Sequence, residues 1–244
     1  MSSSQKVNVL DSIGYVEVLD VFGNDLTVVN AARVSFAKES KEFSEQDGKL
    51  IRYLAKHHHV TPFFHPQIHM RIKMPIFVAR EWYRHQIGFA RNEVSRRYVD
   101  APPECYVPQP EQIRARDPKL KQGSKSEPVE QSDAAYEMIS SATEVAMSEY
   151  KSLLDIGVAP EVARMILPQS MYTEFVETGS LAAYARLCNL RLDPTAQKEI
   201  REYATAVDTL LRDKFPVSWP ALMPQESPAA TDDKKAIPST ETKT

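Results

Sequence analysis

Strict alternation of apolar and polar residues between positions 67 and 74 (QIHMRIKM) constrains the fold of this chain more than any other feature. The apolar residues stand at every second position from Ile68 to Met74, which is the period of a half-buried β-strand. Pro75 follows at once and suits the first turn of a helix, where its missing N–H would have no partner anyway. The sequence therefore predicts a strand that passes directly into a helix from Ile76 to about Gly88.

The rest of the chain shows both strand and helix patterns, which predicts the α+β class. Residues 15–22 and 171–178 are rich in β-branched and aromatic residues, as strands are. Ser44 and Asp47 have the spacing of a capping box, which marks the start of a helix. Residues 101–131 are rich in proline and polar residues, so we expect an extended connection there. The expected helices cover residues 24–36, 44–57, 129–156, 161–167, 180–190 and 195–214.

Length and composition indicate one ordinary domain. The 244 residues with 42% hydrophobic content leave room for a single core, expected over residues 1–220. Residues 221–244 contain no aromatic residue, so we expect a disordered tail. The chain shows neither the apolar stretch of a signal peptide nor a run long enough to cross a membrane. We therefore expect a soluble cytoplasmic protein, or one of the host cytoplasm if the gene is viral.

A local concentration of arginine lies between residues 84 and 98 (RHQIGFARNEVSRRY), at positions 84, 91, 96 and 97. Guanidinium groups so close together repel one another unless an anion lies among them, and their planar donors suit phosphate. The whole chain nevertheless has a formal charge of -3, so its positive charge is local. This favours a pocket for a phosphorylated ligand over the alternatives, a solvated face or a patch that binds nucleic acid.

Cysteine and histidine give no sign of a reactive thiol or a metal centre. Cys105 and Cys188 have neither metal-ligand spacing nor an adjacent histidine that could activate a thiolate. Pro62 and Pro66 interrupt the only concentration of histidines, so no helix can place two of them on one metal. We therefore expect no metal site.

Two arginines, Arg164 and Arg191, lie on otherwise apolar helical stretches. Burying an unpaired charge there would be costly. They could form ion pairs with Glu161 or Asp193, or they could project toward an anionic ligand, and the sequence alone leaves both open.

The chain resembles the flavin-dependent thymidylate synthases, whose fingerprint is RHR, a short spacer and then NExSxRY. Arg84-His85, Asn92-Glu93, Ser95 and Arg97-Tyr98 match it in order. Similar stretches flank the fingerprint, and together the likeness covers about residues 10–215. These stretches are residues 23–36, 61–65, 75–85, 161–168 and 189–197.

The resemblance implies a small antiparallel sheet flanked by long helices and a homotetramer with active sites built from several subunits. It implies reductive methylation of dUMP to dTMP with FAD as cofactor and without a cysteine nucleophile. NADPH would be the reductant and 5,10-methylenetetrahydrofolate the one-carbon donor. No nucleic-acid or membrane partner is expected.

The resemblance also assigns residues to ligands. Arg191 would be the catalytic residue, since a fixed positive charge against the uracil ring stabilises its deprotonated imide. The dUMP-binding residues would be Glu81, Arg84, Glu93, Val94, Ser95, Arg96, Arg97, Arg164 and Arg191, with Ser95 to Arg97 and Arg164 near the phosphate. The FAD-binding residues would be Thr61, Arg84, His85, Gln86, Asn92, Glu93, Ser180 and Arg186.

Some positions depart from the family pattern. Gln86 replaces the third residue of RHR, and Glu81 stands where the family generally has Gln. Glu81 would repel a phosphate unless it pairs with a cation such as Arg80 or Arg84. These departures leave two alternatives open: hydroxymethylation of the same ring and, further from the family, an arginine-rich nucleic-acid-binding module.

Overall fold

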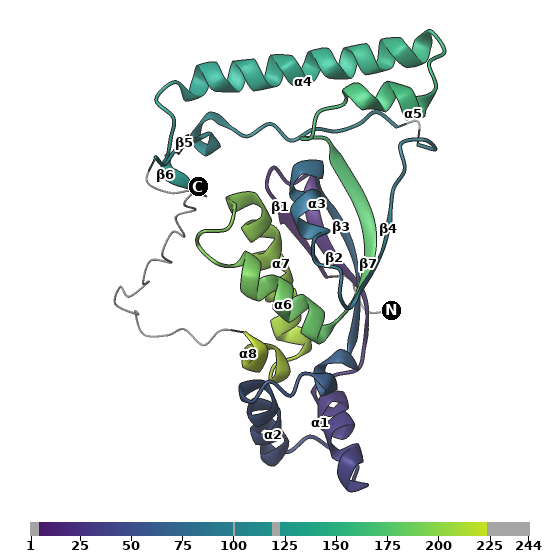
Figure 1. Cartoon of the computed structure of the whole chain (residues 1–244), viewed down its shortest axis with the longest axis vertical. Helices are drawn as coiled ribbons and strands as arrows, with labels where there is room; N and C mark the ends of the chain where they lie inside the picture. Colours follow the sequence, from purple (N-terminus) through teal and green to yellow (C-terminus); the bar gives the residue numbers. More distant parts are fainter. Residues whose placement is uncertain (1–4, 100, 119–122, 224–244) are drawn as a thin grey trace, which may run out of the picture.

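A five-stranded antiparallel sheet lies at the centre of the computed structural model, which describes residues 5–99, 101–118 and 123–223 (Figure 1). The strand order is β1-β2-β3-β7-β4. The strands are β1 (Gln5–Val9), β2 (Gly14–Phe22), β3 (Gln67–Pro75), β7 (Tyr172–Ser180) and β4 (Phe89–Glu93).

The middle strand, β3, confirms the prediction from alternation. Its apolar side chains from Ile68 to Met74 are fully buried, while the residues between them face the other side of the sheet. It pairs with β2 on one side and along its whole length with β7 on the other. The other two predicted strands, β2 and β7, are confirmed as well. The edge strand β1 was not predicted.

Three helices follow the strands and pack on the buried face: α3 (Ile76–Trp82), α6 (Leu181–Arg191) and α7 (Lys198–Lys214). A fourth, α8 (Ser218–Leu222), packs against α6 and α7. Both tryptophans, Trp82 and Trp219, are fully buried in the core that these helices form. α8 ends one residue before Met223, which is buried too, so the packed chain extends past the expected limit at residue 220. The rest of the expected tail, residues 224–244, lies outside the described residues.

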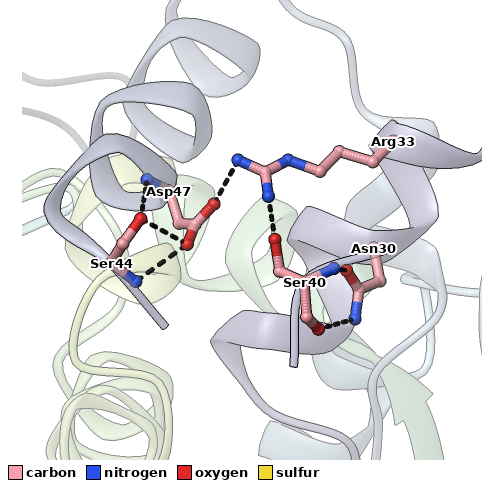
Figure 2. Close-up of polar contacts among 5 residues, drawn as sticks. All are labelled: Asn30, Arg33, Ser40, Ser44 and Asp47. Atoms are coloured by element: carbon pink, nitrogen blue, oxygen red, sulfur yellow. Dashed lines mark hydrogen bonds and ion pairs between the residues drawn. The ribbon is translucent and has the colours of Figure 1, made fainter. Parts of the chain in front are cut away.

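A helical hairpin extends from one end of the sheet, formed by α1 (Asp25–Arg33), a 3-10 turn (Val34–Phe36) and α2 (Glu45–Lys56) (Figure 1). Figure 2 shows how its two helices are joined. Ser44 and Asp47 form the predicted capping box at the start of α2. Asp47 also forms an ion pair with Arg33 at 2.5 Å. Asn30 forms two hydrogen bonds with the backbone of Ser40, at 2.8 and 2.9 Å.

The opposite end carries the long helix α4 (Ser132–Asp155), followed by α5 (Pro160–Ala163) and a 3-10 turn (Arg164–Ile166) (Figure 1). Only Thr143 and Tyr150 of α4 are buried, so most of this helix stands clear of the domain. The connection that leads to it contains a two-stranded hairpin, β5 (Arg114–Arg116) and β6 (Ser124–Pro128). The extended connection predicted for residues 101–131 therefore misses this hairpin.

One predicted helix was too long. α3 ends at Trp82, and the segment predicted to continue it to Gly88 forms a turn that leads into β4. Gly88 has φ +84°, a left-handed value that a right-handed helix does not accommodate. The residues after it pair with β7, a contact that local sequence does not show. None of the helices in the described chain is both long enough and apolar enough to span a membrane.

Asp47→Ala should lower the free energy of unfolding by about 2–3 kcal/mol, because it removes a helix cap and one partner of a largely buried ion pair. Urea denaturation of the full chain measures this. Glu45→Ala is the matched control on the same turn: Glu45 is 82% exposed and pairs only with Lys49, so a change within about 0.5 kcal/mol is expected. Equal effects of the two substitutions would contradict the role of Asp47.

Candidate active site

Arg191, the last residue of α6, makes three hydrogen bonds to the end of α3 and the turn after it. Its Nε donates to Nε2 of His85 at 3.0 Å. Its Nη1 and Nη2 donate to the Glu81 carboxylate and the Glu81 carbonyl at 3.0 and 3.1 Å. The ion-pair alternative for Arg191 thus holds, with Glu81 as a partner that the sequence did not indicate. The partner expected for Glu81, Arg80 or Arg84, was correspondingly wrong.

His85 is kept neutral in this arrangement. Burial lowers its pKa from 6.5 to about 4, and the positive charge of Arg191 is the next largest cause. Arg186, Arg91 and Arg84 act in the same direction. A neutral imidazole has one acceptor nitrogen, and here that nitrogen takes the hydrogen bond from Arg191. His85 therefore orients the guanidinium group without adding a competing charge.

Arg191 lies in a cleft of about 710 Å³, referred to as the Arg191 cleft. Five cationic side chains line it, and Glu81 is the only acidic residue among the described residues of its lining. Such a surface attracts anions. The charged lining residues are Glu81, Arg84, Arg114, Arg191, Lys198 and Arg201.

A second cleft, of about 450 Å³, lies where the chain leaves β4 and is referred to as the Ser95 cleft. Ser95, Arg96 and Arg164 line it together with Glu93 and Glu161. The segment is tied to the sheet, because the Val94 N–H donates to the Glu174 carbonyl at 2.9 Å. A hydroxyl and two guanidinium groups that converge in this way suit a phosphate. Arg164 is exposed, and in the described part of the chain it forms no ion pair with Glu161.

The structure thus brings the predicted dUMP residues together in two groups rather than one. Glu81, Arg84 and Arg191 line the Arg191 cleft, whereas Glu93 to Arg96 and Arg164 line the Ser95 cleft. Arg97 is exposed next to the second group. No described residue lines both clefts.

The predicted FAD residues lie in different environments. Thr61, Arg84, Gln86, Asn92 and Glu93 are exposed, which leaves their polar groups accessible to a ligand. Arg186 donates to the carbonyl of Ile87 and so holds the turn after α3. Ser180 is buried, and its hydroxyl caps α6 by accepting from the Ala183 N–H at 3.2 Å.

Arg91 of the cluster does not belong to either cleft. It pairs with Glu177 directly across the β4–β7 ladder, and Glu177 is fully buried. The indole N–H of Trp82 donates to the same carboxylate at 3.3 Å. Burial raises the pKa of Glu177, and the Arg91 charge opposes that rise. The guanidinium group of Arg91 is therefore paired inside the domain. Sequence reasoning missed Glu177, because an acidic residue on a strand gave no signal of its partner.

The thiols are not poised for nucleophilic attack. Burial raises the pKa of both Cys105 and Cys188, and Cys188 is fully buried. Neither residue lines the Arg191 cleft or the Ser95 cleft. Within the described residues, no group of three or more His, Cys, Asp or Glu side chains is arranged to hold a metal ion.

The family described as "Thymidylate synthase complementing protein" matches residues 17–217 of this chain. The flavin-dependent thymidylate synthase of Thermotoga neapolitana is 39% identical over 218 residues, which cover 89% of this chain and 94% of the relative. The chain belongs to the flavin-dependent thymidylate synthase family. The enzyme of the same name from Thermus thermophilus is 38% identical over 91% of this chain and 79% of its own length.

A solved structure with 31% sequence identity shares the fold. A UMP/dUMP methylase, PolB from Streptomyces cacaoi, bound with 5-Br dUMP, has a TM-score of 0.77 and 31% identity, covering 88% of this chain and 96% of that one. The small antiparallel sheet with its helices is therefore similar to that of this methylase, and the chain is an enzyme of the flavin-dependent thymidylate synthase family.

His85 should remain uncharged down to about pH 4 in this enzyme, and Arg191→Ala should move its pKa toward 6.5. NMR titration of the imidazole measures both values. Because the folded pKa lies below the unfolded one, the unfolded chain binds the proton first as pH falls. The contribution of His85 to stability therefore declines between about pH 6.5 and pH 4. An unchanged midpoint in Arg191→Ala would exclude the Arg191 charge as a cause.

Proposed function

We propose that this protein converts dUMP to dTMP, with FAD as cofactor, NADPH as reductant and 5,10-methylenetetrahydrofolate as one-carbon donor. The observation that carries the proposal is the position of Arg191: a permanent cation, oriented by Glu81 and His85, that lines a cleft rich in positive charge. The PolB neighbour, described as a UMP/dUMP methylase, supports a pyrimidine nucleotide as substrate.

Each part of dUMP has a matching group of residues. Its phosphate binds Ser95, Arg96 and Arg164, because these side chains converge in one cleft and offer charge-assisted hydrogen bonds. The Arg97 backbone N–H donates to the Ser95 hydroxyl at 3.4 Å, which orients that hydroxyl. The uracil ring lies against Arg191. The ring and the phosphate are thereby fixed by separate clefts.

Arg191 supplies the activation that another enzyme could obtain from a thiolate. Methylation needs electron density at carbon 5 of uracil, and a fixed cation favours the deprotonated imide that provides it. The guanidinium group stays charged at any relevant pH. The raised pKa values of Cys105 and Cys188 support a mechanism without a cysteine nucleophile.

Part of the predicted cofactor set fits a dinucleotide. Thr61 and Arg84 offer an exposed hydroxyl and an exposed guanidinium group, donors that suit a pyrophosphate. Gln86 offers an exposed amide beside them, while Asn92 and Glu93 are exposed on β4. Arg186 and the Ser180 cap hold the turn and helix that carry this surface. When bound, FAD supplies the redox chemistry, and the protein supplies orientation and field.

We also propose a homotetramer with shared active sites. In one chain the phosphate residues and the ring residues line separate clefts, so one nucleotide that uses both sets draws them from two copies. Closed symmetric assemblies provide such repeated interfaces. Exposed apolar side chains near the Ser95 cleft support an interface there, among them Val162 (51% exposed) and Met165 (78%). A cytoplasmic location remains a prediction.

The nucleic-acid-binding alternative has less support, because the arginine cluster is not one surface. Arg84 lines one cleft, Arg96 lines the other and Arg91 is paired inside the domain. Hydroxymethylation of dUMP would use the same ring contacts. Mass analysis of the product distinguishes the two reactions.

Arg191→Ala should abolish turnover, with a loss of at least about a hundredfold expected for a group that stabilises developing charge. Tritium release from carbon-5-labelled dUMP, dependent on NADPH and methylenetetrahydrofolate, measures the rate, and the flavin absorbance spectrum shows whether FAD is still bound. Arg212→Ala is the control, since Arg212 pairs with Asp208 on the exposed part of α7. Normal turnover in Arg191→Ala would remove the assignment of the ring activator.

Mixing Arg191→Ala with Arg164→Ala should restore activity if the sites are shared. Each variant alone is expected to be inactive, but subunit exchange places an intact Arg191 opposite an intact Arg164. Random assortment in a symmetric oligomer predicts roughly a quarter of the wild-type rate. Activity that stays at zero after exchange, shown complete by native mass spectrometry, would mean that both arginines serve one nucleotide from the same chain.

A further inference from the structure

The Arg191 cleft contains more positive charge than the proposed reaction uses. Arg191 is assigned to the uracil ring, Arg84 to the nucleotide and cofactor, and the single phosphate of dUMP to the Ser95 cleft. Three other cations line the Arg191 cleft: Arg114, Lys198 and Arg201. The proposed reaction assigns no role to them.

Each of these three side chains has a neighbour that it contacts, and the two arginines are held by hydrogen bonds. Arg114 of β5 donates to the Glu199 carboxylate at 2.7 Å, and Glu199 is buried. Arg201 donates to the carbonyl of Pro194 at 2.8 Å, which uses one of the five N–H donors of its guanidinium group. Lys198 lies 3.8 Å from Glu202 in a half-exposed pair, a contact that contributes little.

The acidic groups nearby offset only part of this charge, because five cationic side chains line the cleft with Glu81 as the one acidic residue among its described lining. Glu81 is bound to Arg191, and Glu199 accepts from both Arg114 and Gln197. Cations that share a cleft of about 710 Å³ repel one another, and a ligand with several negative charges would offset that repulsion.

We propose that Arg114, Lys198 and Arg201 form an anion subsite that binds the charged end of a second co-substrate. The chemistry is that of a multiply charged carboxylate or phosphate: the glutamyl carboxylates of the folate or the 2′-phosphate of NADPH. Guanidinium groups suit both, because each presents paired oxygen acceptors. The subsite rests on the proposed function, since that function assigns the phosphate of dUMP elsewhere.

The test uses the full-length, FAD-loaded protein saturated with dUMP, and isothermal titration calorimetry. The probes are tetrahydrofolate with one or with three glutamyl residues, and NADPH against NADH. The preference is the ratio of the dissociation constants of the two probes in a pair. Lys198→Glu and Arg201→Gln should each lower this ratio about tenfold, the equivalent of one charge-assisted contact. The probe pair that shows the loss identifies the anion.

Lys49→Glu is the matched control, because Lys49 is also a helix-surface lysine paired with a glutamate four residues away. The Lys49→Glu variant should show the same preference for the more highly charged probe as the wild-type protein. The subsite is overturned if both cleft variants behave like this control, or if they weaken FAD or dUMP instead of the co-substrates. Failure of the proposed function looks different, because the wild-type protein would then bind no dUMP and form no thymidylate.

Discussion

The candidate site depends on the contact of Arg191 with Glu81 and His85, because it joins two helices that leave the sheet in different places. α3 begins at the end of β3, and α6 begins at the end of β7. These strands are antiparallel neighbours, so the helices start at opposite ends of the sheet and run toward each other. Their last residues meet, and a guanidinium group is fixed between a carboxylate and a neutral imidazole. The fold thus positions a cation that the flexible arginine side chain alone would not hold.

Glu81 gives this contact an unusual charge balance. The resemblance implies Gln at this position, an amide that could accept the same hydrogen bond without neutralising Arg191. Here the carboxylate partly cancels the field that Arg191 directs at a ligand, while it also fixes the guanidinium geometry. The remaining positive field in the cleft therefore comes from the other lining cations. Among them, Arg84 is the nearest to Glu81 in sequence. In the proposed reaction, these cations would add to the field that Arg191 directs at the ring.

Local patterns predicted the elements whose causes are local. The alternation from Ile68 to Met74 gave the central strand, and the Ser44–Asp47 spacing gave the start of α2 with its capping box. The predictions that were wrong concern contacts between residues far apart in the sequence. The helix expected to reach Gly88 ends early because the following residues pair with β7, whose partners lie far away in sequence. The resemblance predicts that the arginine segment binds a ligand, but neither the resemblance nor the spacing showed that Glu81, 110 residues before Arg191, is the partner of Arg191.

The arginine motif is continuous in sequence and divided in space, and its residues line two separate clefts. Arg84 lies on the turn after α3, Arg91 lies within β4, and Arg96 follows the strand. A strand advances about 3.3 Å per residue, so β4 carries the later arginines away from the first. Since alternate residues of a strand face opposite sides, Arg91 turns inward to Glu177 instead of joining either cleft. The proposed shared site rests on this division, because a mononucleotide that uses both ends of the motif would draw them from two copies.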